Sequence, residues 1–347
     1  MKNPDRDALW LKRGLLALAA AGVLIAAPAR ADYQLESQVK MPGAKIAWDY
    51  LNFDPATRRV YVARLVVGMT VFSVDENKIL GNLEKASGAH GVAFVQDAGR
   101  GYTSNDDGTS TIFDLKSMTT LDTIKVGDDN DANVYDPASK SVFFINSDAG
   151  TATAVDGASG KVTGKLQLKS KHPEFPSADG TGKLFIAIQD KNEIAAFDTK
   201  AMKEIGRWPT GVCKQPTATA IDPSTHRLFI GCRSDAPVLA VMNTDAGAIV
   251  ASVPIGRGTD AATFDPETKK IYVASGVDAK VTVVQQKSPD EYAVVETIAT
   301  KPQARTIALD PKTKKIYLVT AETLPAPPGQ RALYKPDSFT LLTYAPK

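Results

Sequence analysis

TAIDPSTHRLFIG (219–231) is the clearest copy of a pattern that decides the fold of this chain. A segment rich in β-branched and small residues leads to Asp-Pro, a short polar turn follows, and a second apolar segment ends the copy. Asp hydrogen-bonds its own backbone and Pro presets φ, so this dipeptide opens a turn. Because the flanking residue types favour strands, the segment predicts a β-hairpin.

The same hairpin recurs along the chain. Five clear copies and two degenerate ones occupy 51–63, 133–145, 219–231, 263–274, 308–319, 93–104 and 177–187. In six of the seven copies, all but the C-terminal one at 308–319, two more short apolar strands follow. A four-strand unit therefore repeats every 41–45 residues. Such a unit is typical of a propeller blade. The sequence therefore predicts an all-β, seven-bladed β-propeller with four antiparallel strands in each blade.

The two ends of the repeat region indicate how the ring closes. The last copy has one further strand before Lys347, while the segment YQLESQVKMPG (33–43) resembles the fourth strands of the other units. We expect this N-terminal strand to complete the C-terminal blade, because the pairing removes an exposed sheet edge. The alternative is a six-bladed ring with extra strands.

Residues 1–31 have the pattern of a signal peptide. A basic start precedes the apolar run LLALAAAGVLIAA (15–27), and Ala29-Arg30-Ala31 forms a small-x-small cleavage signal. The run has 13 residues, fewer than the roughly 20 that a membrane-spanning helix needs. We expect cleavage after Ala31, export to the periplasm, and one propeller domain over 32–347. An uncleaved membrane anchor is the alternative.

The net charge of the chain after removal of the leader bears on which partners it can bind. The predicted leader carries five basic and two acidic residues, so its removal changes the net charge from +2 to −1. This value disfavours nucleic-acid binding, which needs a clustered basic face. No other apolar run reaches the length of a membrane span. We expect a monomer that binds a small molecule or an envelope protein.

The repeats resemble those of a known family. RVYVA (59–63) and KIYVA (270–274) are similar to the core of the YVTN repeat, and HPEFPSADG (172–180) and 304–322 resemble less repetitive stretches of the YncE-like exported propellers. The resemblance covers essentially all of residues 32–347. It implies the propeller fold and export, and it implies little about activity.

A candidate site follows from the repeat register. In a propeller the loops that enter the innermost strands share one face, which we call the top face, and the residues just before those strands point toward the mouth of the central channel. Stepping back five residues from the Asp of each Asp-Pro, or its equivalent, selects one position per blade. These positions are Asp49, His90, Asp131, Glu174, Thr217, Asp260 and Arg305.

These ring positions predict ligand binding at the channel mouth. Asp49, His90, Asp131 and Glu174 are consecutive around the ring, and such a set could hold Ca²⁺ or a similar divalent cation. His90 is the best candidate for a general base. Arg305 could bind a substrate carboxylate or phosphate. The alternative is structural, because polar residues are expected at a wet channel mouth.

Two further features map to the same face. Cys213 and Cys232 flank one blade's first hairpin, and in an oxidising compartment they predict a disulfide rather than a thiol nucleophile or a soft metal pair. The Pro-rich segment 321–338 lies between the second and third strands of the last blade. Long loops in compact domains are often functional, so this segment is a lid candidate, with a plain surface insertion as the alternative.

Three functions remain open from the sequence. The first is a non-catalytic periplasmic binding or scaffold propeller, and it is favoured because no complete catalytic set can be read from the spacing. The second is a divalent-metal-dependent hydrolase, of the lactonase kind, at the same mouth. The third is an accessory electron-transfer subunit like the propeller partners of quinone-dependent amine dehydrogenases, for which the chain shows no cofactor ligands.

Overall fold

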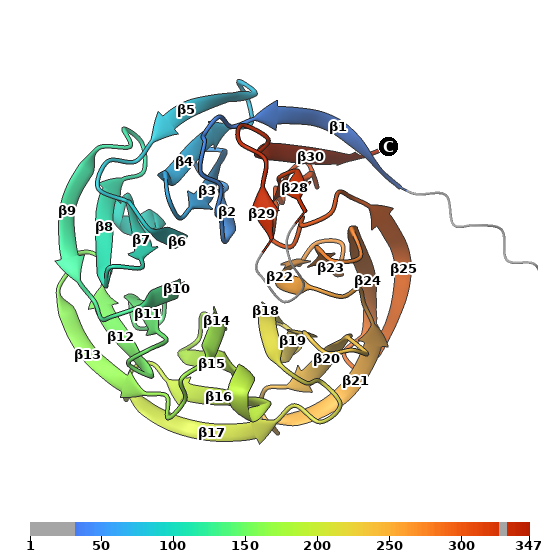
Figure 1. Ribbon diagram of the computed structural model, residues 1–347. Coiled ribbons are helices and arrows are strands. Elements are labelled where there is room, and N and C mark those ends of the chain that lie inside the picture. Colours follow the sequence, from blue (N-terminus) through green and yellow to red (C-terminus); the bar gives the residue numbers. More distant parts are fainter. Residues whose placement is uncertain (1–31, 326–331) are drawn as a thin grey trace, which may run out of the picture. The chain divides into compact units, whose positions relative to one another are not determined.

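The computed structural model describes residues 32–325 and 332–347, and the leader predicted over 1–31 lies outside them. Seven four-stranded antiparallel sheets surround a central channel, as Figure 1 shows. This confirms the seven-bladed propeller and excludes the six-bladed alternative. Among the described residues, no helix is long and apolar enough to cross a membrane.

Six blades are continuous in sequence, and each runs from the channel outward in chain order. Their strands are β2 (Leu51–Asp54), β3 (Arg59–Arg64), β4 (Gly68–Ser73) and β5 (Lys78–Asn82) in blade 1; β6 (Ala89–Val95), β7 (Arg100–Asn105), β8 (Thr109–Asp114) and β9 (Thr120–Lys125) in blade 2; β10 (Asn130–Asp136), β11 (Ser141–Asn146), β12 (Thr151–Asp156) and β13 (Val162–Gln167) in blade 3; β14 (Pro173–Ala178), β15 (Lys183–Ile188), β16 (Glu193–Asp198) and β17 (Lys203–Pro209) in blade 4; β18 (Pro216–Asp222), β19 (Arg227–Cys232), β20 (Val238–Asn243) and β21 (Ala248–Pro254) in blade 5; β22 (Thr259–Asp265), β23 (Lys270–Ser275), β24 (Lys280–Ser288) and β25 (Glu291–Ala299) in blade 6. Two 3₁₀ turns, η1 (Gln96–Ala98) and η2 (Gln189–Lys191), adjoin blades 2 and 4.

Blade 7 joins the two ends of the chain. It contains β26 (Ile307–Leu309), β27 (Ile316–Thr320), β30 (Thr340–Pro346) and, as its outer strand, β1 (Tyr33–Lys40). Strand β1 pairs antiparallel with β30 from Tyr33 opposite Pro346 to Lys40 opposite Thr340. The predicted closure by the N-terminal strand is therefore confirmed.

The hydrophobic core is divided among the blade interfaces. Seven clusters of buried side chains lie one between each pair of neighbouring blades. The aromatic residue of each second strand supplies much of this packing, as Tyr61, Tyr102 and Phe229 illustrate at 0% exposure. Because every blade packs on two neighbours, the inner strand ends are held in fixed positions around the channel.

The turns of the Asp-Pro repeats form the opposite, bottom face. The carboxylates that open them, which we call the Asp-Pro ring, are at most 1% exposed and belong to Asp54, Asp136, Asp222, Asp265 and Asp310. Each accepts hydrogen bonds from its own turn, as when Thr313 Oγ1 donates to Asp310 at 2.6 Å. The next blade often adds a cation: Arg58 of blade 1 binds Asp310 of blade 7 at 2.9 Å. The repeat dipeptide thus ties neighbouring blades together.

Candidate functional site

A cavity of about 580 Å³ lies at the top of the channel, and we call it the mouth cavity. Five of the seven predicted ring residues line it, namely Asp49, Asp131, Glu174, Asp260 and Arg305. The remaining two, His90 and Thr217, are not among the lining residues. The other lining residues are Ile46, Ala47, Trp48, Tyr50, Leu65, Arg233, Gln303, Ala332 and Tyr334.

Local backbone geometry aims the predicted residues at the mouth. In blades 2 to 6 the pairing between the first and second strands shifts register at the top of the inner strand. The residues left out of the pairing at these bulges include Asp131, Glu174 and Asp260, which line the mouth cavity. A bulge leaves its residue unpaired and turns its side chain out of the regular alternation. Repetition of the bulge therefore brings unlike side chains together at one rim.

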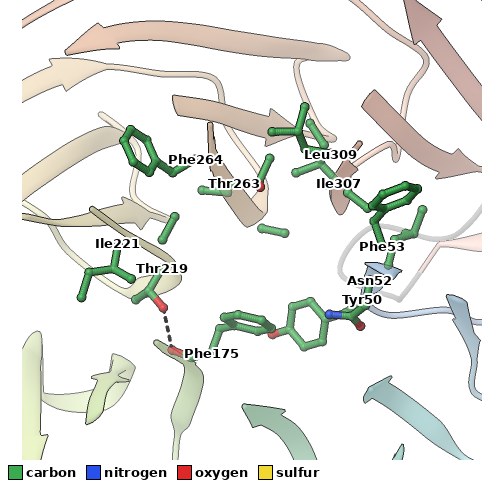
Figure 2. A pocket seen from close by; sticks show the side chains of 15 residues that line it. Tyr50, Asn52, Phe53, Phe175, Thr219, Ile221, Thr263, Phe264, Ile307 and Leu309 are labelled. Atoms are coloured by element: carbon green, nitrogen blue, oxygen red, sulfur yellow. Dashed lines mark hydrogen bonds between the residues drawn. The ribbon is translucent and has the colours of Figure 1, made fainter. Parts of the chain in front are cut away.

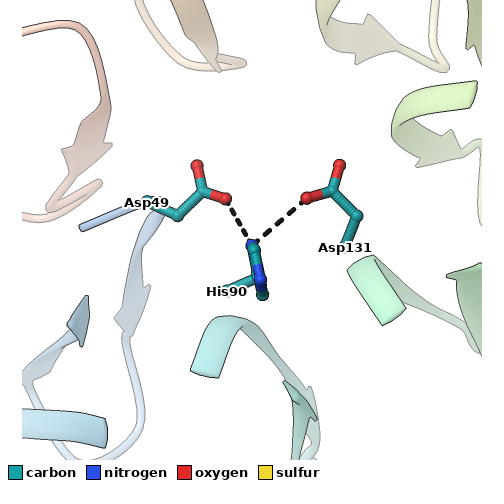
Figure 3. Close-up of side chains that lie close together, drawn as sticks. All are labelled: Asp49, His90 and Asp131. Carbon is teal, nitrogen blue, oxygen red and sulfur yellow. Dashed lines mark hydrogen bonds and ion pairs between the residues drawn. The ribbon is translucent and has the colours of Figure 1, made fainter. Parts of the chain in front are cut away.

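His90 lies between two carboxylates. Its Nδ1 is 2.8 Å from Oδ2 of Asp49 and 3.2 Å from Oδ1 of Asp131, as Figure 3 shows. The side chains of His90, Asp49 and Asp131 are 13%, 15% and 26% exposed. Burial, the largest single influence, acts to lower the pKa of His90, but the hydrogen bonds and charges of Asp131 and Asp49 together outweigh it and raise the pKa to about 10. The imidazole is accordingly a cation at neutral pH.

The pKa of Asp49 lies above that of an ordinary surface carboxylate. Burial raises its pKa to about 7, assisted by the nearby Asp131 and Asp260 and opposed by the hydrogen bond from His90. Near neutral pH this carboxyl therefore titrates within the cluster. Because Asp49 and His90 are in hydrogen-bond contact, the protonation of each group changes the pKa of the other, and the two titrate as a pair.

The same three residues could hold a cation. One ligand atom from each of Asp49, His90 and Asp131 lies within 4.8 Å of the others. The carboxylate of Glu174, predicted as a fourth ligand, is outside this group and instead accepts a hydrogen bond from Nε2 of Gln189 at 2.6 Å. Metal binding would have to displace the proton from Nδ1 of His90, because a ligating imidazole is neutral.

Glu174 and Thr217 form a separate polar contact through Gln189. The Nε2 group of Gln189 donates to both side chains, at 2.6 Å to Glu174 and 3.1 Å to Thr217. Burial raises the pKa of Glu174 well above its usual range, although the charge of Arg233 acts against this. Glu174 therefore takes up a proton more readily than an exposed glutamate does, and Thr217 accepts a hydrogen bond from the same Gln189 donor.

The other side of the mouth is basic. Asp260, which is 5% exposed, accepts hydrogen bonds from two arginines: Nε of Arg305 at 2.6 Å and NH2 of Arg233. Arg233 was not predicted from the sequence. It directly follows β19 and reaches into the next blade, where its Nε donates to the carbonyl of Thr259 at 2.8 Å. Only the register between two blades brings it to the mouth.

An aromatic wall flanks the arginines. The guanidinium of Arg305 lies 4.7 Å from the ring centre of Trp48, a cation–π contact, and its NH2 donates to the Trp48 carbonyl at 2.7 Å. The ring centre of Tyr334 lies 4.9 Å from that of Trp48. Tyr334 belongs to the hairpin of β28 (Thr323–Leu324) and β29 (Leu333–Tyr334), within the predicted lid segment 321–338. Residues 326–331 of that segment lie outside the described residues.

Below the mouth, most of the side chains that line the channel are apolar. A second cavity of about 300 Å³ is lined by inner-strand side chains that include Ile221, Phe264 and Leu309. Tyr50 and Phe175 meet across it with ring centres 4.7 Å apart, and Figure 2 shows this pair. Tyr50 also lines the mouth cavity, so the aromatic pair marks the boundary between the polar mouth and the apolar channel.

The predicted disulfide is present. Cys213 and Cys232 are bonded, with 5.4 Å between their Cα atoms, and both are fully buried. The bond joins the loop that enters blade 5 to the end of β19, immediately before Arg233. Of the other histidines, His172 is exposed on the top face, and His226 lies 2.6 Å from Asp245 at the bottom face.

Comparison with protein-family models gives no match, and comparison with the curated proteins gives none either. Among solved structures, "Crystal structure of RRP9 WD40 repeats" superposes with a TM-score of 0.74 at 11% identity, covering 90% of this chain and 99% of that chain. A chain of "Crystal Structure of Mitotic Checkpoint Complex" gives 0.73 at 18%, covering 96% and 99%. "Kuenenia stuttgartiensis Hydrazine Synthase" gives 0.67 at 13%, covering 80% and 94%. At these identities the likeness shows the fold alone: a seven-bladed β-propeller with WD40-like structural neighbours.

Proposed function

We propose that this protein is an exported binding propeller of the YncE-like type, which holds a small ligand, or a side chain of an envelope protein, in the mouth cavity. The observation that carries the proposal is this cavity of about 580 Å³, where charged groups from six blades converge. Its volume falls in the range of small-molecule sites, roughly 300–1,000 Å³.

The chemistry of the mouth supports binding. Asp260 is paired with two arginines and His90 with two carboxylates, so the polar groups are held before any ligand arrives. Preorganised groups on rigid strand ends lower the entropic cost of binding. His90, the best candidate base, is raised in pKa and protonated at neutral pH, which suits it to donate rather than to accept a proton.

A ligand screen tests the proposal. Purified protein would be screened by thermal shift against small polar metabolites and against an envelope extract, with hits measured by calorimetry. We expect binding that Asp131→Asn weakens and that the matched top-face variant Asp148→Asn leaves unchanged, since Asp148 is exposed outside the cavity. Hits that bind both variants and the wild type equally would place the binding site elsewhere and contradict the proposal.

Export is a separate part of the proposal. The basic start, apolar run and Ala29-Arg30-Ala31 signal support cleavage after Ala31, and the disulfide between Cys213 and Cys232 agrees with an oxidising compartment. Cell fractionation and N-terminal sequencing test it directly. A mature chain that starts at Asp32 in the periplasmic fraction is the expected result, and an intact leader in the cytoplasm would overturn it.

A second candidate is a divalent-metal-dependent hydrolase of the lactonase kind. The observation that favours it is the trio Asp49, His90 and Asp131, whose ligand atoms are close enough to share one cation. A bound cation could polarise an ester carbonyl or lower the pKa of a water molecule. Elemental analysis, thermal shift with Ca²⁺ and Zn²⁺, and a lactone hydrolysis assay test this candidate. Turnover that requires metal and disappears in Asp131→Asn would favour it over the binding protein.

A further inference from the structure

The paired arginines at the mouth have hydrogen-bond donors that no residue within 32–325 or 332–347 engages. Arg305 uses Nε for Asp260 and NH2 for the carbonyl of Trp48. Arg233 uses Nε for the carbonyl of Thr259 and NH2 for Asp260. Among the described residues, the NH1 group of neither arginine has a hydrogen-bond partner, and both side chains line the mouth cavity at 26% and 34% exposure.

We infer that the mouth cavity binds its ligand through an anionic oxygen group, a carboxylate or a phosphate, held by the NH1 groups of Arg233 and Arg305. This inference rests on the proposed function and names the class of ligand. Two guanidinium groups that converge on one place are suited to such planar or tetrahedral anions, because each hydrogen bond is charge-assisted.

Charge supports the assignment. Two arginines share one carboxylate, so Arg233, Asp260 and Arg305 together carry a net positive charge. The opposite side of the mouth, with Asp49, His90 and Asp131, has two carboxyl groups and one imidazole. A ligand with an anionic end and hydrogen-bond donors at its other end would therefore match both sides.

Both arginines are held in place before binding. Arg305 is fixed by Asp260, by the Trp48 carbonyl and by the indole ring 4.7 Å away. Arg233 directly follows the disulfide-bonded Cys232. Arg257, another top-face arginine, differs in each respect: its side chain is 61% exposed and it pairs with Asp278 alone. Immobilised donors lose less side-chain entropy on binding than a solvated arginine does.

Titration with simple anions tests the inference. Trp48 reports on the site, and in a chain that starts at Asp32 the variant Trp208→Phe leaves it as the single tryptophan. We would add inorganic phosphate or succinate, with glycerol as a neutral probe, up to roughly 10 mM, and follow Trp48 fluorescence and heat of binding. We expect an anion response that saturates and none with glycerol. Arg233→Gln and Arg305→Gln should each weaken anion binding by about 10-fold or more, since a charged hydrogen bond is lost.

Matched variants separate binding from folding. Arg257→Gln should bind anions as the wild type does. Arg233→Lys and Arg305→Lys keep a cation beside Asp260 and should fold normally, while losing most of the affinity because lysine lacks the fixed fork. Thermal melting would confirm that each variant is folded at the assay temperature.

The outcomes distinguish this inference from the proposed function. Anion binding that is equal in the wild type and in the lysine variants would overturn the inference. A wild-type protein that binds no anion, yet binds a neutral or cationic metabolite at the mouth, would overturn the inference and leave the proposed function standing. A protein that binds neither anions nor any screened ligand or envelope component would count against both.

Discussion

The two rims of the propeller carry the same residue types in opposite settings. At the bottom, the carboxylates of the Asp-Pro ring are hydrogen-bonded by their own turns. Burial acts to raise the pKa of Asp310, but hydrogen bonds from Arg58 and Thr313 more than offset it and hold the pKa below its usual range. At the mouth, burial wins, and it raises the pKa of Asp49 and of Glu174. The difference teaches that the bottom carboxylates stabilise the fold, whereas the mouth carboxyl groups cost stability.

Geometry explains why the two rims differ. Bottom carboxylates come with their own donors, because the turn that each one opens supplies an amide and a hydroxyl, as at Asp265 with Glu267 N and Thr268 Oγ1. The top residues stand on bulges and loops whose turns supply no such donors. Asp49 and Asp260 depend on side chains of other blades, His90 and Arg305, and Glu174 depends on Gln189 of its own blade. Groups that are buried without full compensation are typical of functional sites.

The largest effect on stability should come from a substitution in the Asp-Pro ring at the bottom face. In Asp310→Ala, the side chain of Arg58 and the donors of the turn lose a fully buried acceptor, and we expect the free energy of unfolding to fall by about 3–5 kcal/mol. Urea unfolding followed by circular dichroism measures this. Glu291→Ala, which removes an exposed pair with Lys287, is the control and should change little. Equal midpoints for the two variants would contradict the division into a structural and a functional rim.

The disulfide tests the same comparison, because Cys232 directly precedes Arg233 of the mouth cavity. Cys213→Ser/Cys232→Ser should lower the free energy of unfolding by about 3 kcal/mol, since the closed loop spans a sequence separation of 19 residues. Below its melting transition the variant should bind ligands more weakly at the mouth, because Arg233 directly follows Cys232. Calorimetric melting and anion titration check the two parts. Wild-type affinity in the folded variant would show that Arg233 needs no such support.

His90 should make stability depend on alkaline pH. Its pKa is raised to about 10 in the folded protein, so its contribution is complete below the unfolded value of about 6.5 and is lost as pH rises toward 10. The full change in pKa corresponds to about 5 kcal/mol, and because Asp49 titrates in the same cluster we expect a loss of about half of that, on the order of 2 kcal/mol. It is measured as the difference in unfolding free energy between wild type and His90→Gln across that range. His226→Gln, at the bottom face and 56% exposed, is the matched control and should leave the pH profile unchanged.

The smallest expected effect is a gain in thermal stability. Glu174 has a raised pKa, so it stabilises the folded state fully only below its unfolded pKa of about 4.3 and loses that contribution as pH rises. Glu174→Gln removes the titration and should raise the melting temperature at neutral pH by about 1–2 °C. Scanning calorimetry at neutral and acid pH tests this. Glu267→Gln, which breaks an exposed pair with Lys314 at the bottom, should show no gain. A loss of stability in Glu174→Gln would sink the idea that mouth carboxyl groups are costly.

Much of the site could be found from sequence because repeats define a register. Counting five residues back from each Asp-Pro located Asp49, Asp131 and Asp260 at the cavity, although no two of them are near in sequence. Counting could not show that Glu174 turns to Gln189 rather than to His90, since that depends on side-chain direction at a bulge. It could not find Arg233 either, which acts from the end of one blade on the carboxylate of the next.

By itself the sequence determined the number of blades, the four-strand unit, the closing strand and the pairing of the two cysteines. The first three depend on local turn chemistry and on strand periodicity, which recur in every repeat. The cysteine pairing depends on the presence of two cysteines in a chain with an export signal. Only the tertiary structure decided which charges meet: His90 between two carboxylates, two arginines on Asp260, and Tyr334 against Trp48. The physical reason is that these contacts join different blades, and their lengths depend on bulges and packing that no single repeat contains.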